Sequence, residues 1–322
     1  MAVSETALSL GIAVGLALST APEAGVVTAG PYDGPAVGAL ALYAGSWVEP
    51  GGAWRDALSA TGPTIPEGPV AAQEDKPDYY EVPGCHVGRT VTAVAPCVLG
   101  DPEGTDTWLV LGSSKTGTWV DPLSAIAAAE GVRLETGTRS STPWTPGFGS
   151  GDGRAYNDAA LDYIHQTAPE VLFLTWDQPA DFSMGPQEYA DVVTRALEAG
   201  AGRVVVLWNP GGAEPNPMTC LEGEPADYRT CAFTFVDEAL DAAAEDLAEA
   251  SSDVSYASVR DWVAPEGEGQ MVIGGVITRG AGSHLTATYA RSLQRPLASE
   301  LFEVGLLDRD PDAMPHERMD RR

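Results

Sequence analysis

The sequence predicts an α/β fold: a doubly wound, three-layer sandwich with a mostly parallel sheet. Three observations support this. From about residue 105 short apolar runs alternate with amphipathic stretches, the runs are almost continuous in Val and Leu, and a chain of 322 residues can bury a large core. Strands that are apolar throughout belong to a parallel sheet covered on both faces, which carries its functional groups at the carboxyl ends of its strands.

Each element follows from its local pattern. Strands are expected where aliphatic and β-branched residues cluster between turn residues, at Thr107–Leu111, Val132–Thr136, Val171–Thr175, Arg203–Trp208 and Val254–Ala257, with a strand or hairpin over Met271–Ile277. Helices are expected where apolar residues recur at helical spacing, at Trp119–Glu130, Tyr156–Gln166, Gln187–Ala199, Phe235–Ala250 and, as one long closing helix, Leu285–Val304.

The charge balance excludes some partners. The chain has 18 Lys and Arg against 46 Asp and Glu, a formal net charge of −28. Such a field repels phosphate backbones and anionic lipid headgroups, so nucleic acid is not expected as a partner. A solvated acidic surface is the simplest use of this charge.

The four cysteines form two close pairs, Cys85 with Cys97 and Cys220 with Cys231. Their separations do not match the short spacing of zinc ligands, and no metal or other cofactor is expected. Two local disulfides are predicted, the alternative being four separate buried thiols. Disulfides persist in oxidising compartments, so the first interpretation favours an extracytoplasmic location.

The chain divides into four segments. Residues 1–24 contain an uncharged apolar run, Thr6–Ala21, which is short for a membrane span and lacks the basic residues of a secretory signal. The end of a transmembrane helix, an atypical signal or anchor, and a buried helix all remain open for it. Residues 25–104 are rich in Pro and Gly and are expected to form an extended linker that wraps the domain. Residues 105–305 form the α/β domain, and 306–322 a polar tail.

Two loops carry residues suited to nucleophilic catalysis. Gly112-Ser113-Ser114-Lys115 directly follows the first strand, where a serine hydroxyl is exposed at the sheet edge, although helix capping explains a serine there equally well. A phosphate-binding loop is not indicated, because the Lys precedes the second Gly. His284 lies in the loop that opens the last helix, and in a doubly wound domain this loop can lie beside the loop after the first strand.

These motifs, in this order, resemble a known family. The Cys97-x-x-Gly-Asp-Pro run, the Gly112-Ser113-Ser114 turn and the His284-Leu285-Thr-x-Thr-Tyr sequence are similar to the C-terminal SGNH hydrolase-like domain of bacterial membrane O-acyltransferases. The resemblance runs from about Asp33 to Leu301 and implies a flavodoxin-like SGNH hydrolase fold. It also gives the N-terminal apolar run a meaning, as the last span that tethers such a domain to the membrane.

The resemblance implies roles for individual residues. The family's Gly-Asp-Ser motif falls on Gly112, Ser113 and Ser114, which makes Ser114 the nucleophile, and its Asp-x-x-His motif ends on His284, the general base. Ser113 and Ala281 stand where the family has Asp, and Lys115 stands where other members have His. Without an orienting carboxylate, a Ser–His dyad is expected, with the positive charge of Lys115 near the oxyanion.

The oxyanion donors depart further from the family, which places a Gly after the second strand and an Asn after the third. Gly137 is the counterpart of the first. Asp177 and Gln178 occupy the second region, and because a carboxylate repels an oxyanion, Gln178, Asn157 or Asn209 is expected to donate.

The family implies an extracytoplasmic O-acyltransferase or esterase acting on a cell-surface polysaccharide or peptidoglycan. A multi-span membrane acyltransferase domain is the expected protein partner. The altered site positions leave an alternative from another class, a catalytically inactive binding or docking module of such an acyltransferase. Transfer and hydrolysis also remain open, because either a sugar hydroxyl or water can resolve an acyl-enzyme.

Overall fold

The computed structural model of the chain describes residues 38–43, 58, 62–178, 183–236, 238–280 and 282–311. Within these ranges no helix is both long and apolar enough to cross a membrane. The apolar segment expected at residues 1–24, the position of Ala281 and the end of the polar tail from residue 312 lie outside the described residues.

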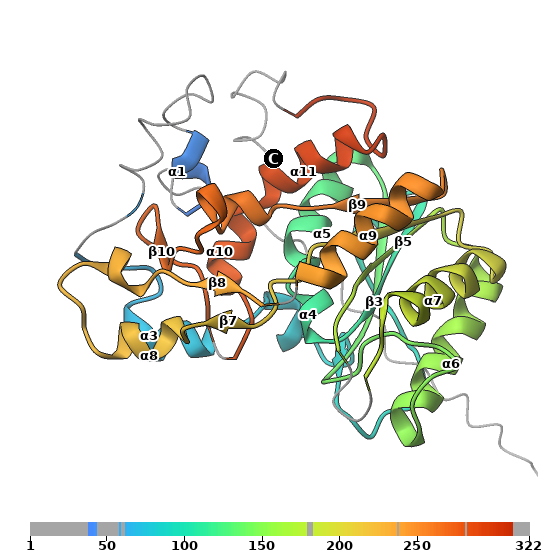
Figure 1. Cartoon of the computed structure of the whole chain (residues 1–322). Helices are drawn as coiled ribbons and strands as arrows, with labels where there is room; N and C mark the ends of the chain where they lie inside the picture. Colours follow the sequence, from blue (N-terminus) through green and yellow to red (C-terminus); the bar gives the residue numbers. More distant parts are fainter. Residues whose placement is uncertain are drawn as a thin grey trace, which may run out of the picture.

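Five parallel strands form the centre of the molecule (Figure 1), in the order β4, β3, β5, β6, β9 across the sheet. Numbered along the chain from β3, this is the 2-1-3-4-5 order of a flavodoxin-like doubly wound fold, as predicted. The registers align Leu111 with Gly137 and Gly112 with Thr138. The strands are β3 (Thr107–Gly112), β4 (Arg133–Arg139), β5 (Val171–Thr175), β6 (Arg203–Leu207) and β9 (Val254–Ala257).

Two short strands extend the sheet beyond β4. β1 (His86–Val87) pairs with β4 in parallel, and β2 (Cys97–Gly100) pairs with it in antiparallel orientation. Both lie within the segment expected as an extended linker, residues 25–104, so part of that segment belongs to the sheet itself. Runs of two and four residues between prolines carry too little periodicity to be recognised in the sequence. The predicted Cys85–Cys97 disulfide is confirmed and lies beside these strands, with 5.1 Å between its Cα atoms.

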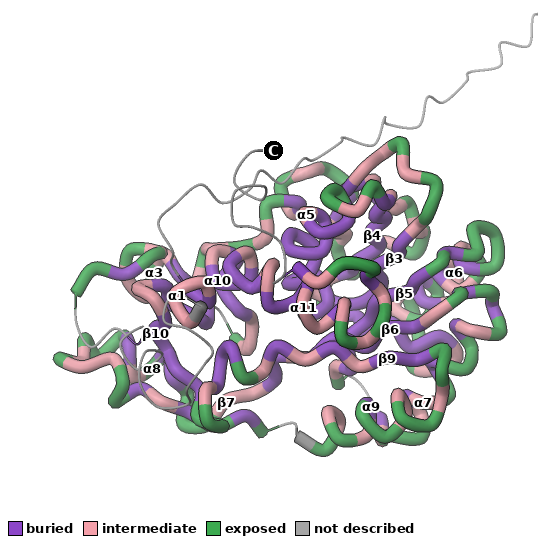
Figure 2. The backbone as a smooth tube through the Cα atoms, turned by 90° about the horizontal axis from the view of Figure 1, so that it is seen from above, coloured by how far each residue is buried: buried purple, intermediate pink, exposed green. Residues whose placement is uncertain are grey.

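Helices cover both faces of the sheet, which confirms the three-layer sandwich (Figure 2). Along β3, Trp108 and Val110 pack toward one layer, whereas Leu109 and Leu111 pack toward the other. Because both faces are dry, each large side chain contributes about 1.5–3 kcal/mol of burial free energy. The first layer contains α5 (Val120–Glu130), α10 (Ala287–Ser292) and α11 (Gln294–Glu303), and the second α6 (Gly151–Thr167), α7 (Pro186–Glu198) and α9 (Glu238–Ala250).

The end of the domain differs from the single closing helix predicted over residues 285–304. The structure has two helices, with Leu293 as the C-cap of α10 and α11 beginning at Gln294. Pro296 explains the break: its ring has no N–H to donate to Ser292 and would clash with the carbonyl of that residue in a continuous helix. In the first turn of a new helix a proline is tolerated.

A smaller lobe packs beside the sandwich, seen on the left of Figure 1. Its apolar centre includes Ala72, Met218 and Ile277, and the confirmed Cys220–Cys231 disulfide crosses it with a Cα–Cα distance of 5.5 Å. The lobe comprises α3 (Gly68–Glu74), α8 (Pro217–Glu222), the 3₁₀ turn η2 (Tyr228–Cys231), the pair β7 (Ala213–Glu214) and β8 (Thr234–Phe235), and the hairpin of β10 (Val272–Ile273) and β11 (Val276–Ile277).

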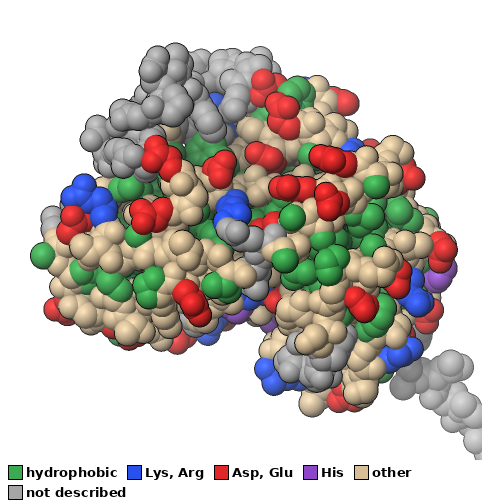
Figure 3. All heavy atoms as spheres, viewed as in Figure 1, with side chains coloured by type: hydrophobic (Ala, Val, Ile, Leu, Met, Phe, Trp, Pro, Cys, Tyr) green, Lys and Arg blue, Asp and Glu red, His purple; other side chains and the backbone are tan. Residues whose placement is uncertain are grey.

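Four further helical turns lie outside these groups, besides the short helix α4 (Ser114–Gly117) that follows β3. They are α1 (Leu40–Tyr43), η1 (Asp78–Glu81), η3 (Arg260–Trp262) and η4 (Pro265–Gly267). On the face shown in Figure 3, acidic side chains are scattered over the surface and basic ones are few. This distribution fits a solvated acidic surface.

Candidate active site

A tight turn at the carboxyl end of β3 presents Ser114. Gly112 has a φ of +149°, and a side chain at this position would collide with Thr116, so the turn requires glycine. Ser113 then caps the short helix α4 (Ser114–Gly117), because its Oγ accepts a hydrogen bond from the backbone N–H of Lys115 at 3.0 Å. The cap makes Ser114 the first residue of α4, half-buried at the edge of the sheet.

The predicted histidine meets this serine. The Oγ of Ser114 lies 2.8 Å from Nε2 of His284, across a sequence separation of 170 residues. The loop that carries His284 is closed at its base by an antiparallel bridge between Arg279 and Leu285. His284 is also half-buried, so both groups remain accessible. Ala281, where the family has an orienting Asp, lies outside the described residues, and the consequence of that replacement stays a prediction.

Ser113 and Asp177 connect the two strands at the centre of the sheet. Ser113 Oγ donates a hydrogen bond of 2.9 Å to Oδ2 of Asp177, which follows β5. The carbonyl oxygen of Asp177 accepts a hydrogen bond from the hydroxyl of Tyr189. This pair spans the boundary between β3 and β5, the point where a doubly wound sheet changes direction and where ligands bind in such folds. An ionised Asp177 accepts hydrogen bonds and has none to give to an oxyanion.

The predicted amide donors are engaged elsewhere. The Gln178 amide both donates to and accepts from the backbone of Met184, at 2.7 and 3.0 Å. Asn157 is buried, and its Nδ2 donates to the carbonyl of Pro143 at 3.0 Å. Nδ2 of Asn209 donates to the Trp176 carbonyl at 2.7 Å. Each of these amides thus has a structural hydrogen bond, and their part in binding an oxyanion stays a prediction.

Gly137 does not lie in a loop after its strand. It is buried inside β4, opposite Leu111 in the register with β3. A Cβ at Gly137 would lie 3.0 Å from a methyl group of Leu111, so close packing of the sheet is a sufficient reason for glycine here.

Lys115 is directed at the histidine loop. Its ammonium group donates to the carbonyl oxygen of Ser283 at 2.6 Å and also to the Ser283 hydroxyl. The lysine is buried, with 7% of its surface exposed. Its charge therefore contacts the residue before His284.

His86 lies near Ser114 and His284, a position that sequence reasoning did not predict. Its ring stacks on Tyr80 with 4.1 Å between centroids, and its ring nitrogens bond the hydroxyls of Thr138 at 2.9 Å and Ser140 at 3.0 Å. Burial, and secondarily the charge of His284, lowers the pKa of His86 to about 4. His86 therefore stays neutral near His284 at neutral pH. His86 directly follows Cys85 and begins β1. Its position near the site could be inferred only once β1 was known to pair with β4.

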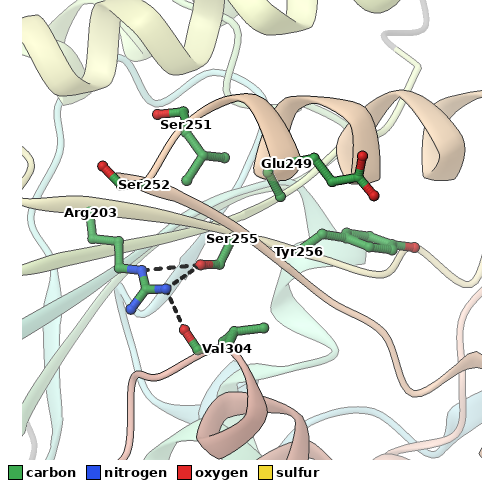
Figure 4. Close-up of a pocket in the computed structure, with 9 residues that line it drawn as sticks. Arg203, Glu249, Ser251, Ser252, Ser255, Tyr256 and Val304 are labelled. Atoms are coloured by element: carbon green, nitrogen blue, oxygen red, sulfur yellow. Dashed lines mark hydrogen bonds between the residues drawn. The ribbon is translucent and has the colours of Figure 1, made fainter.

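A cavity of about 360 Å³ lies at the opposite, amino edge of the sheet (Figure 4). Arg203 borders it and donates hydrogen bonds to Ser255 Oγ and to the carbonyl of Val304. The cavity is lined by Arg203, Ala248, Glu249, Ser251, Ser252, Val254, Ser255, Tyr256 and Val304, a set with no imidazole to activate a hydroxyl.

Comparison with solved structures finds three that are similar to this chain over part of its length. The periplasmic domain of a lipopolysaccharide acetyltransferase from Salmonella ser. Paratyphi A aligns with a TM-score of 0.52 and 16% identity, covering 63% of this chain and 86% of that chain. A carbohydrate esterase family 2 enzyme from Corynascus thermopiles (Myceliophthora fergusii) aligns with a TM-score of 0.36 and 11% identity, covering 62% and 68% of the two chains. A family two carbohydrate esterase mutant from Clostridium thermocellum aligns with a TM-score of 0.38 and 12% identity, covering 64% and 66%.

Sequence comparison gives the family directly. No curated protein matches the chain. The family described as the SGNH domain fused to AT3 domains matches residues 84–299, a range that includes β1, the Ser114 turn and the histidine loop. This protein belongs to the SGNH domain family.

Proposed function

We propose that this domain is an extracytoplasmic O-acyltransferase or esterase that acts on a cell-surface glycan through Ser114 and His284. The distance of 2.8 Å between Ser114 Oγ and His284 Nε2 carries the proposal, because a nucleophile and its base must lie within hydrogen-bonding reach. Two disulfides support an oxidising compartment. The family's description as fused to AT3 domains supports a membrane acyltransferase as the partner.

The chemistry follows in two balanced steps. Ser114 Oγ attacks the carbonyl carbon of an acyl donor while its proton passes to Nε2 of His284. The tetrahedral intermediate collapses, the donor's ester bond breaks, and the leaving oxygen takes that proton. In the second step His284 removes a proton from a sugar hydroxyl or from water, whose oxygen attacks the acyl carbon. The bond between that carbon and Ser114 Oγ then breaks, and Oγ takes the proton back from His284. A sugar acceptor gives transfer and water gives hydrolysis.

Backbone groups are the proposed oxyanion donors. The side-chain amides of Gln178, Asn157 and Asn209 each donate at least one hydrogen bond to another acceptor. The N–H of Ser114, as the first residue of α4, has no acceptor within its helix. We assign it to the developing oxyanion, with Asp177 kept at the site by Ser113 rather than as a donor.

A serine-reactive fluorophosphonate tests the nucleophile. We expect stoichiometric labelling of the wild-type protein at Ser114, observed by intact mass and peptide mapping, and no labelling in Ser114→Ala. Hydrolysis of p-nitrophenyl acetate should fall by on the order of 10⁴-fold or more in that variant. Ser252→Ala, which removes an exposed hydroxyl at the amino edge, is the matched control and should behave as wild type.

The engaged amides favour one rival function, an inactive binding or docking module on the same fold. Without strong oxyanion donors a Ser–His pair loses much of its catalytic effect. A wild-type protein that takes no label and hydrolyses no small ester, yet binds acetylated or unmodified polysaccharide in a pull-down, would replace the enzyme proposal by this one.

A further inference from the structure

The nucleophile turn and the histidine loop are joined at two adjacent points. Lys115 follows Ser114 in the nucleophile turn (residues 112–115), and Ser283 precedes His284 in the histidine loop (residues 278–286, of which 281 is not described). Ser114 bonds His284, and the ammonium of Lys115 bonds both the carbonyl and the hydroxyl of Ser283. Consecutive residues on one element therefore bond consecutive residues on the other.

The base of the histidine loop is held by its own backbone. Thr286 N–H donates to the carbonyl of Thr278 at 3.1 Å, and the N–H of Gly280 donates to the carbonyl of His284 at 3.0 Å. Toward its tip the loop contains Gly282, with a φ of +62°. Glycine is favoured at such a φ because it has no side chain to clash with the backbone. The contact from Lys115 reaches this part of the loop from a different element.

Burial strengthens the contact between Lys115 and Ser283. The side chain is 7% exposed, and an ammonium group removed from water must be compensated by hydrogen bonds. Charge-assisted hydrogen bonds are about twice as strong as neutral ones, and the 2.6 Å bond to the Ser283 carbonyl is short. Release of Ser283 would leave a buried charge without these partners, so the loop and the lysine hold each other in place.

We propose that Lys115 is a positioning residue that fastens the histidine loop to the nucleophile turn and so fixes His284 against Ser114. The inference rests on the proposed function for its catalytic consequence, but the structural attachment stands apart from it. The Ser114–His284 hydrogen bond restrains the distance between these two groups, and the attachment at the neighbouring Ser283 also restrains the backbone that carries the imidazole. Loss of such alignment costs on the order of a hundredfold in rate when reacting atoms move by about 1 Å.

The test compares Lys115→Met with Lys115→Arg and with Lys76→Met. Lys76 is the other lysine of the chain, exposed and paired with Glu74 at 3.3 Å, so its replacement changes the net charge equally. We expect Lys115→Met to lower kcat for p-nitrophenyl acetate by about 10- to 100-fold with KM within about twofold. Lys115→Arg should recover most of kcat, and Lys76→Met should match wild type.

Hydrogen exchange separates this role from a purely electrostatic one. The amides of Gly280 and Thr286, which bond across the base of the loop, should exchange about 10- to 100-fold faster in Lys115→Met and at the wild-type rate in Lys76→Met. Unchanged exchange in Lys115→Met would overturn the proposal, since a lysine that acts only by charge leaves the loop in place. An arginine variant with kcat as low as that of the methionine variant would also overturn it.

Two further measurements separate a failure of the proposed function from a failure of the Lys115 proposal. If wild-type Ser114 takes no fluorophosphonate, the proposed function fails, while the exchange measurement still decides whether Lys115 holds the loop. If Lys115→Met does not fold, Ser283→Ala removes the hydroxyl partner of the lysine from a half-exposed position. Exchange of the Gly280 and Thr286 amides should then be about 3- to 10-fold faster, and an unchanged rate would refute the attachment.

Discussion

The carboxyl and amino edges of the central sheet each place a basic side chain against a serine and a backbone carbonyl. At the carboxyl edge Lys115 bonds Ser283, one residue from an imidazole that meets a serine hydroxyl. At the amino edge Arg203 bonds Ser255 and the end of α11 beside a cavity of about 360 Å³. This cavity lies away from the reactive pair. Convergent groups at the strand ends, rather than cavity size, identify the site of this fold.

Removal of His284, the proposed general base, should have the largest effect and tests whether the carboxyl edge is the reactive one. In His284→Ala we expect the turnover of p-nitrophenyl acetate to fall by about 10²–10⁴-fold, because Ser114 loses its proton acceptor. The melting temperature should stay near that of wild type, since the histidine is half-buried in a surface loop. His165→Ala, on the exposed face of α6, is the control. A loss of less than tenfold would mean that His284 is not the base.

A substitution at the amino edge should lower the stability of the fold and leave turnover unchanged. Arg203→Met removes hydrogen bonds to Ser255 Oγ and to the carbonyls of Val304 and Gly305 that tie β6 to β9 and to the end of α11. We expect the free energy of unfolding, measured by urea denaturation, to fall by about 1–3 kcal/mol with turnover unchanged. A drop in turnover with unchanged stability would instead connect this cavity to the chemistry.

A third prediction concerns His86, whose titration tests the electrostatics at the carboxyl edge of the sheet. Its pKa in the folded protein is about 4 against an ordinary value of 6.5, so between these values the unfolded chain binds the extra proton. Stability from this group is therefore lost as the pH falls from about 6.5 to about 4. His86→Phe keeps an aromatic ring on Tyr80 but cannot titrate.

The measurement is the free energy of unfolding against pH. Between pH 6.5 and 4 the free energy of unfolding should fall less steeply in His86→Phe than in wild type, because the variant lacks this titrating group. The carboxylates that titrate in the same range are common to both proteins, so the difference reports His86. Equal slopes in the two proteins would show that the folded state does not disfavour the charged form of His86.

Much of the sandwich could be predicted because its signals are local. The strands Val171–Thr175 and Val254–Ala257 were placed with the bounds the structure gives, since each is a buried run between turn residues. Helix ends were displaced by a few residues: the helix predicted from Phe235 begins at Glu238. The break at Leu293 was missed because apolar spacing continues across it, although Pro296 was the sign.

Less of the candidate site than of the fold could be predicted from local sequence patterns. Ser114 and His284 were found from their places at strand and helix boundaries and from the family motifs, and the structure brings them together. The amides proposed for the oxyanion also bond backbone carbonyls, as Gln178 does that of Met184 within its own loop. No sequence pattern records such a bond, because it depends on how a loop returns on itself.

The sequence by itself determined the alternation of strands and helices, the two cysteine pairs and the residue types at the carboxyl ends of the strands. These follow from periodicity and spacing, which encode the faces of each element. Only the tertiary structure decided that Ser113 bonds Asp177, that His86 joins the sheet beside the site, and that Lys115 bonds the histidine loop. Such pairings depend on positions fixed to within an ångström by packing between distant segments, and hydrogen bonds are sensitive to that scale.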